Sequence, residues 1–184
     1  MLIEAEHREN LFHREHHFRV SGAPYSRRMG VSLRPLNDAD LDQLYRWECD
    51  DAAIAMAAFT RPDPADRAAF DEHYRRVRAD PTVADLAVEH DGHVVGMIAG
   101  FTVEGDREVT YWIDPARWGR GIASEALRLF LAREPIRPLH ARAAQHNLGS
   151  ARVLTRNGFA KVGEESSWSP GLGRTITEDV YRLE

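Results

Sequence analysis

The chain has 184 residues, enough for one domain that buries a core without disulfides or metals. Its hydrophobic and charged fractions, 43% and 29%, are those of a globular protein, and its formal charge of -5 gives no general attraction to nucleic acid or anionic membranes. We expect neither a membrane span nor a signal peptide, because no apolar run is long enough. The single cysteine, Cys49, excludes an internal disulfide and favours a reducing cytoplasmic location.

Residues 1–28 have little hydrophobic periodicity and carry His7, His13, His16 and His17. A histidine-rich tract can bind metal, whereas a polar extension requires no ligand. We favour the extension and expect no metal site. The folded domain is predicted over residues 29–184.

Hydrophobic patterns predict the strands and helices of this domain. Alternation and β-branched residues predict strands, in chain order, over 31–36, 85–90, 93–103, 107–113, 139–144, 159–165 and 175–184. Apolar residues recurring every three or four positions predict helices over 38–56, 65–79, from 117 to 133, and over 149–157.

Local signals mark where several of these elements begin and end. Asn37 with Asp40 has the pattern of a capping box, and Asp63-Pro64 is predicted to cap the second helix. The remaining signals are the hairpin dipeptide Asp91-Gly92 and the helix-stopping Gly158.

The order of the elements predicts an α/β (α+β) fold with a mixed, mostly antiparallel sheet flanked by helices. Consecutive strands before residue 107 favour antiparallel pairs. The strands at 107–113 and 139–144 are separated by a helix, so a right-handed crossover would make them parallel neighbours.

A glycine-containing stretch, RWGRGIA at residues 117–123, lies between the 107–113 strand and the next helix. A P-loop requires Gly-Lys-Ser/Thr, but residues 121–123 are Gly-Ile-Ala. A dinucleotide fingerprint requires a third glycine where Ser124 stands. Two interpretations remain: a tight strand-to-helix turn, or a loop whose amides and helix N-terminus bind a pyrophosphate beside Arg117 and Arg120.

Two sequence blocks resemble the GNAT acetyltransferases. EVTYWIDPARWGRGIASEAL, residues 108–127, is similar to their acyl-CoA loop, Gln/Arg-x-x-Gly-x-Gly/Ala. NLGSARVLTRNGF, residues 147–159, is similar to the Asn-x-x-Ser/Ala…Gly-Phe segment that follows. Trp118 departs from Gln/Arg, as in the branch resembling ribosomal-protein N-terminal (RimJ/RimL-like) acetyltransferases. The loop positions are Trp118, Gly119, Arg120, Gly121, Ile122 and Ala123.

The resemblance implies a GNAT fold in which the central parallel pair splays to form an acyl-CoA cleft. It implies acetyl-CoA as the co-substrate, with the loop amides on its pyrophosphate and the backbone of Trp112 and Ile113 on its pantetheine arm. Asn147 matches a cofactor-contacting position but would equally cap a helix, and Arg152 is either a phosphate ligand or a solvated side chain. The expected cofactor-binding residues are Trp112, Ile113, Arg117, Trp118, Gly119, Arg120, Gly121, Ile122, Ala123, Asn147, Ser150 and Arg156.

Two residues are the expected catalytic groups. Glu108 opens the strand leading into the cleft, where relatives place a base that often acts through water; the alternative is an exposed glutamate at a strand edge. Ser150 would protonate the leaving thiolate or bind the cofactor, because Leu154 replaces the tyrosine that many relatives carry seven residues after the asparagine. His140 and His146 are nearby alternatives that we interpret as structural.

The sequence thus predicts an N-acetyltransferase that moves acetyl directly to a primary amine, on a protein N-terminus or a small molecule. Cys49 has no activating base beside it, so we expect no covalent intermediate. The alternatives are another acyl-CoA, an antibiotic or polyamine acceptor, and a non-catalytic acyl-CoA sensor. The acidic run at residues 48–51 would attract a cationic amine or simply be solvated. No nucleic-acid or membrane partner is expected, and the sequence is compatible with a homodimer.

Overall fold

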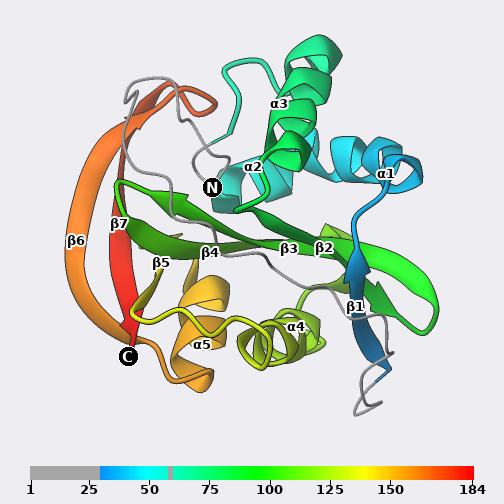
Figure 1. Cartoon of the computed structure of the whole chain (residues 1–184). Coiled ribbons are helices and arrows are strands. Elements are labelled where there is room, and N and C mark those ends of the chain that lie inside the picture. The colour runs from blue at the N-terminus through cyan, green and yellow to red at the C-terminus, as the bar shows by residue number, and fades with distance from the viewer. Residues whose placement is uncertain (1–29, 58–59) are drawn as a thin grey trace.

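The computed structural model describes residues 30–57 and 60–184, which form a mixed sheet with helices on both faces (Figure 1). The strands are β1 (Val31–Pro35), β2 (Ala84–His90), β3 (His93–Val103), β4 (Asp106–Ile113), β5 (Leu139–Ala144), β6 (Ala160–Ser169) and β7 (Arg174–Leu183). The helices are α1 (Asp38–Glu48), α2 (Asp51–Ala57), α3 (Arg67–Ala79), α4 (Ile122–Leu131) and α5 (Leu148–Arg156), with a 3-10 helix η1 (Pro115–Arg117). The expected extension over 1–28, with its histidines, lies outside the described residues.

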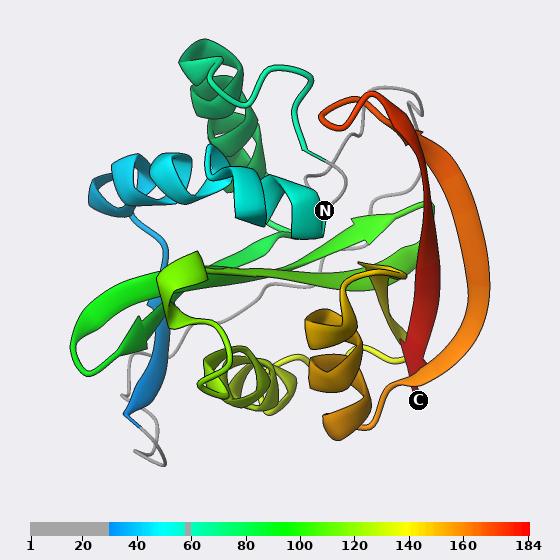
Figure 2. The same cartoon turned by 180° about the vertical axis from the view of Figure 1, so that it is seen from behind.

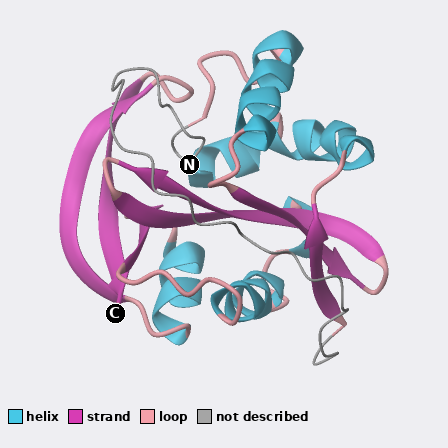
Figure 3. Cartoon of the chain, in the orientation of Figure 1, coloured by secondary structure: helices cyan, strands magenta, loops and turns pink. Residues whose placement is uncertain are grey.

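The described strands are ordered β1-β2-β3-β4-β5-β7-β6. All neighbouring strands are antiparallel except β4 and β5, which are parallel. The helical layers lie on opposite sides of this sheet, as Figure 3 shows by colour. These findings confirm the predicted fold class, including the parallel neighbours on either side of α4.

Each face of the sheet has its own core. Figures 1 and 2 show α1–α3 on one side and α4 with α5 on the other. Phe70 and Leu44 pack with Met97 and Ala99 on the α1–α3 side. The core on the α4–α5 side includes Phe130, Leu127, Leu154, Ile98 and Val109. Side chains of a strand alternate between these two cores, and this alternation decides what each face presents to a ligand.

The helix predicted over 38–56 is wrong, because it is two helices. Cys49 forms the C-terminal cap of α1, and the Asp50 carboxylate then accepts a hydrogen bond from the Ala53 amide at 3.0 Å. An aspartate that binds a nearby amide in this way opens a new helix. Apolar periodicity does not detect such a break.

Two other predicted helix starts are also wrong. Asp66, not Asp63, caps α3 by accepting from the Ala69 amide at 2.9 Å. Asp63 caps the preceding turn through the Ala65 amide. The helix predicted from residue 117 begins at Ile122, after η1 and the glycine stretch.

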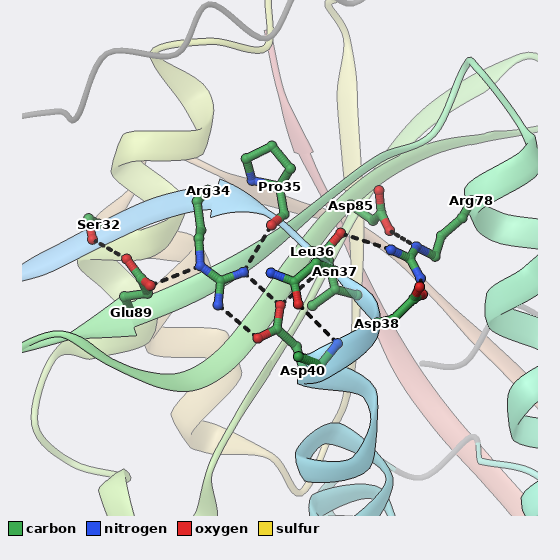
Figure 4. A network of polar contacts seen from close by, with 11 residues as sticks. Ser32, Arg34, Pro35, Leu36, Asn37, Asp38, Asp40, Arg78, Asp85 and Glu89 are labelled. Atoms are coloured by element: carbon green, nitrogen blue, oxygen red, sulfur yellow. Dashed lines mark hydrogen bonds and ion pairs between the residues drawn. The ribbon is translucent and has the colours of Figure 1, made fainter.

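A polar network fixes the junction of β1, β2 and α1 (Figure 4). The Arg34 guanidinium donates to both carboxylate oxygens of Asp40, at 2.6 and 2.7 Å, and to Glu89 at 2.9 Å. The Asn37–Asp40 capping box is confirmed. The Asn37 side chain accepts from the backbone amide of Asp40, and the Asp40 carboxylate accepts from the backbone amide of Asn37. Arg78 joins α3 to this junction through Asp38 and the Leu36 carbonyl.

This network predicts how stability depends on pH. The hydrogen bonds from Arg34 lower the pKa of Asp40 below its ordinary value. A carboxylate with a lowered folded-state pKa stabilises fully above its unfolded pKa, and this contribution is lost as the pH falls through the folded pKa. Asp40→Asn should therefore lower the free energy of unfolding by about 2 kcal/mol near neutral pH. It should also reduce the further loss of stability that the wild type shows below about pH 4.

Urea titrations across the acid range measure this effect. Asp42→Asn is the control, because Asp42 lies on the same helix and pairs with Arg67 at the surface. It should change the free energy of unfolding by no more than about 0.5 kcal/mol. An unchanged acid limb in Asp40→Asn would contradict the assignment.

Candidate functional site

The central feature of the site is the separation of β4 and β5. The two strands pair at only two positions, Arg107 with Leu139 and Glu108 with His140. A cavity of about 610 Å³ opens where the pairing ends. Separation of the strands was expected, and this cavity lies between them.

Residues far apart in sequence line this cavity. The structure brings all of the expected cofactor-binding residues to its wall, whereas what they bind stays a prediction. Of the two expected catalytic residues, Ser150 lines the cavity and Glu108 does not. The lining comes from α2 (Ala53, Met56, Ala57), β4 (Val109, Thr110, Tyr111, Trp112, Ile113), residues 117–124, β5 (Ala141, Arg142, Ala143, Ala144), Asn147, and α5 (Gly149, Ser150, Arg152, Val153, Arg156).

The glycine stretch gives α4 an uncapped N-terminus at the cavity wall. Gly119 and Gly121 have φ values of 76° and 78°, in the left-handed region that residues with a Cβ seldom adopt. Gly121 is the N-cap and supplies no side-chain hydrogen bond. The first amides of a helix have no partner within the helix, so this end is suited to an anion.

Four arginines add positive charge to the same wall. Arg117 and Arg120 precede α4, and Arg152 and Arg156 lie on α5. Arg117 is 4.0 Å from the Asp114 carboxylate, but the other three make no ion pair with a described residue. They are exposed and available to a multiply charged anion.

The backbone of β4 differs from the expectation for Trp112 and Ile113. The Asp114 amide donates to the Val95 carbonyl, which sets the alternation of the β3–β4 ladder and turns the Trp112 backbone toward β3. The Ile113 backbone faces the cavity, but its carbonyl accepts from the Trp118 indole at 2.8 Å. Tyr111, at the preceding cavity-facing position, is the better backbone partner for an extended ligand.

Tyr111 is also the functional side chain that the sequence did not identify. Its hydroxyl lies 2.7 Å from the Ser150 hydroxyl, and both residues line the cavity. Burial raises the pKa of Tyr111 well above its ordinary value, so the phenol stays protonated near neutral pH. The only available signal was alternation, which places Tyr111 on the same face as Val109 and Ile113.

Asn147 and His146 connect the two helical layers. The Asn147 carbonyl oxygen accepts from the Ser150 amide at 2.9 Å, which confirms it as the N-cap of α5. Its amide nitrogen donates to the Met56 carbonyl at 3.0 Å, and His146 donates to the Ala55 carbonyl at 2.7 Å. His146 therefore has a structural contact, while Asn147 also faces the cavity.

Glu108 is buried, not the exposed strand-edge glutamate of the alternative interpretation. The residue is 3% exposed, and its Oε1 lies 3.3 Å from the Arg142 side chain, which lines the cavity. Its Oε2 is buried and has no hydrogen-bond partner among the residues that the structure describes. Cys49 instead donates to the Pro64 carbonyl and is not part of the cavity wall.

The described part of the chain has neither a metal-binding cluster nor a membrane-spanning helix. No group of three or more His, Cys, Asp or Glu side chains there is arranged to hold a metal ion. No helix among residues 30–57 and 60–184 is both long and apolar enough to cross a membrane.

Comparison with known families decides what this arrangement is. A family model described as Acetyltransferase (GNAT) domain matches residues 31–160. The chain belongs to the GNAT acetyltransferases. No curated protein matches it significantly in sequence.

Solved structures share the fold of this GNAT acetyltransferase at 18–22% identity. RimJ from Mycobacterium smegmatis with CoA-disulfide has a TM-score of 0.70 and 22% identity, over 83% of this chain and 81% of that chain. Spermidine N-acetyltransferase from Vibrio cholerae with CoA and spermine has a TM-score of 0.69 and 18% identity, over 84% of this chain and 95% of that chain. Aminoglycoside acetyltransferase AAC(6')-Ib with coenzyme A has a TM-score of 0.62 and 20% identity, over 82% of this chain and 93% of that chain. RimJ represents the branch indicated by the sequence motifs.

The uncapped helix predicts that Gly121→Val weakens acetyl-CoA binding to this GNAT acetyltransferase. The added side chain would lie where phosphate oxygens must approach the amides, and affinity should fall at least about tenfold. Isothermal titration calorimetry measures the change. Equal affinity in a folded variant would remove this loop from the binding site.

Gly105→Val is the matched control for backbone strain. Gly105 has a φ of 92° in the β3–β4 turn, and a Cβ there meets nothing within 4 Å. The same strain is therefore introduced away from the cavity, and acetyl-CoA affinity should not change.

Proposed function

We propose that this GNAT acetyltransferase moves the acetyl group of acetyl-CoA directly to a primary amine, on a protein N-terminus or a small molecule. The cavity between β4 and β5 carries the proposal, because it combines an uncapped helix N-terminus, four arginines and a strand edge. Coenzyme A has phosphates for the first two and an amide-containing arm for the third. The single Cys49 supports a cytoplasmic location.

The cavity supports a definite orientation of the cofactor. The pyrophosphate would bind the amides of residues 119–123, with Arg152 and Arg156 near the ribose phosphate. The pantetheine arm would run along β4 and pair with the Tyr111 backbone. This direction brings the thioester toward Ser150 and the Arg142 end of the cavity.

Ser150 and Tyr111 would together protonate the leaving group. The amine attacks the thioester carbonyl carbon, a C–N bond forms, and the C–S bond breaks to release a thiolate. Ser150 gives its hydroxyl proton to the thiolate, while the neutral Tyr111 phenol donates a hydrogen bond to the Ser150 oxygen and stabilises the charge that develops there. Water that has taken up the proton of the amine returns a proton to Ser150 before the next turnover. This pair replaces the tyrosine that is absent at Leu154.

Glu108 would receive the proton that the amine loses, through a water molecule. Its unpartnered Oε2 and its contact with Arg142 place it next to the cavity but not on the wall. No covalent acetyl-enzyme is needed, because cofactor and amine meet in one cavity. Intact-mass spectra with acetyl-CoA alone should therefore show unmodified protein.

Thiol release from acetyl-CoA with a panel of amines, polyamines and N-terminal peptides tests the proposed function. Glu108→Gln should reduce turnover at least about a hundredfold and leave acetyl-CoA affinity intact, because only the base is removed. Glu164→Gln, at an exposed position on β6, should behave as the wild type. Binding of acetyl-CoA without thiol release from any amine would favour a non-catalytic sensor.

The hydroxyl pair predicts a distinct kinetic effect. Tyr111→Phe keeps the ring and should lower kcat about tenfold, and Ser150→Ala should lower it further. The double variant should be no slower than Ser150→Ala, because Tyr111 acts through the serine. Steady-state kinetics and acetyl-CoA calorimetry separate this effect from cofactor binding.

Tyr45→Phe is the control for the loss of a tyrosine hydroxyl. The Tyr45 hydroxyl donates to the Ala65 carbonyl in the α1–α3 layer, so its removal should not change kcat. Independent, multiplicative effects of Tyr111→Phe and Ser150→Ala would contradict the relay.

A further inference from the structure

Four charged side chains gather on the α1–α3 face where β4, β5, β7 and β6 are neighbours. Arg142 contacts Glu108 at 3.3 Å and also forms an ion pair with Glu165. Glu178 is the register partner of both Glu165 on β6 and Ala144 on β5. We call Glu108, Glu165 and Glu178, arranged around Arg142, the carboxylate cluster.

The carboxylate cluster has more negative charge than its own cation compensates. Three carboxylates lie around one guanidinium, which leaves two negative charges when all are ionised. Burial raises the pKa of Glu178, so a cation beside it would favour its ionised form. Arg142 directs its side chain to Glu108 and Glu165. Glu178 is 5% exposed and has no hydrogen bond or ion pair with a described residue.

Two basic neighbours among the described residues, His140 and Arg182, do not pair with the carboxylate cluster, although His140 Nδ1 and Arg182 Nε are buried without a hydrogen-bond partner there. His140 is the register partner of both Glu108 and Arg182, but its Nδ1 lies 4.0 Å from the Asp106 carboxylate. Arg182 pairs with Glu184 at 2.9 Å. Neither residue forms an ion pair with the carboxylate cluster.

A buried oxygen without a partner points independently to a ligand. Glu108 is 3% exposed, and its Oε2 has no hydrogen-bond partner among residues 30–57 and 60–184. Leaving a buried carboxylate oxygen unpaired is costly, and native structures normally provide it with a donor.

The carboxylate cluster adjoins the cavity on the side of the sheet opposite α4 and α5. Arg142 lines the cavity, and so do Thr110 and Trp112 on the Glu108 face of β4. Residues of the other face, Val109 and Ala141, pack in the core shared with α4 and α5. Arg142 is the member of this group on the cavity wall, so an acceptor reaching the thioester from the α1–α3 side would reach the carboxylates beside Arg142.

We propose that the carboxylate cluster binds a second cationic group of the acceptor, so that preferred acceptors carry a positive charge besides the amine that is acetylated. The proposal rests on the proposed function and narrows its substrate class. The attacking amine must be neutral, so it cannot compensate the two excess charges at the moment of transfer. A second ammonium or guanidinium can do so by pairing with Glu165 and Glu178, while Glu108 receives the proton of the attacking amine.

Matched acceptors test the proposal. Putrescine and butylamine differ by a second amine, as do peptides with lysine or norleucine after the N-terminal residue; the two pairs distinguish a small-molecule from a protein source. In at least one pair, kcat/KM should be at least about tenfold higher for the dication, the lower end of what a charge-assisted hydrogen bond provides. A ratio near one in both pairs would overturn the proposal.

Charge-neutral variants assign the preference to the cluster. Glu178→Gln should bring the dication-to-monoamine ratio toward one, and Glu165→Gln, at an exposed position, should shift it the same way if the first variant folds poorly. Glu164→Gln is the matched control on the same strand: its carboxylate pairs with Lys161, and its ratio should stay that of the wild type. An unchanged ratio in a folded Glu178→Gln or Glu165→Gln variant would overturn the proposal.

Calorimetry with putrescine and with the lysine peptide separates this proposal from the proposed function. At least one of these ligands should bind the wild-type protein without acetyl-CoA and lose about tenfold in affinity in Glu178→Gln but not in Glu164→Gln. Such binding without any thiol release would support the cluster and refute the acetyl transfer. Failure of both ligands to bind the wild type, or equal affinity in Glu178→Gln, would refute the cluster even if acetyl transfer occurs.

Discussion

The limited pairing of β4 with β5 is the constraint on which the site depends. Two residue pairs hold the strands together, and beyond Glu108 their backbones separate while each keeps an antiparallel partner on its outer side. Backbone groups that would otherwise complete a parallel ladder then face the cavity. Buried amides and carbonyls need partners, so a ligand with amide groups can take the place of a strand. Trp118 already occupies one of these positions by donating to Ile113.

Alternation along the same strands separates two kinds of chemistry. Tyr111, Ala141 and Ala143 lie toward α4 and α5, where the uncapped helix and the arginines line the cavity. Glu108 and Arg142 lie toward α1–α3. The two faces of one pair of strands therefore adjoin basic groups on one side and an acidic cluster on the other, without a separate domain for either.

Local signals explain most of what could be predicted from the sequence. The strands, the Asn37–Asp40 capping box and the stop at Gly158 depend on residues close together in the chain. The two motif blocks also consist of residues close together in the chain, and they correctly indicated residues that line the cavity. The helix over 38–56 failed because the Asp50 side chain, rather than hydrophobic periodicity, ends one helix and begins the next.

The remaining features depend on register and on long-range contacts. Whether the Trp112 backbone faces β3 or the cavity is set by the phase of the β3–β4 ladder, which composition does not encode. Tyr111 and Ser150 are 39 positions apart, and Glu108 and Arg142 are 34 apart. Neither pair has a local signature, so only the fold brings these side chains together.

The contact of Asn147 and His146 with α2 has a thermodynamic consequence. Asn147 caps α5 and also donates to the Met56 carbonyl at the end of α2, while His146 donates to the preceding carbonyl, that of Ala55. A cofactor that ordered the first turn of α5 would thus also order α2 in the other helical layer. Such linkage is reciprocal: each substrate should strengthen binding of the other by the same factor, so that the ternary complex forms more readily than either binary complex predicts.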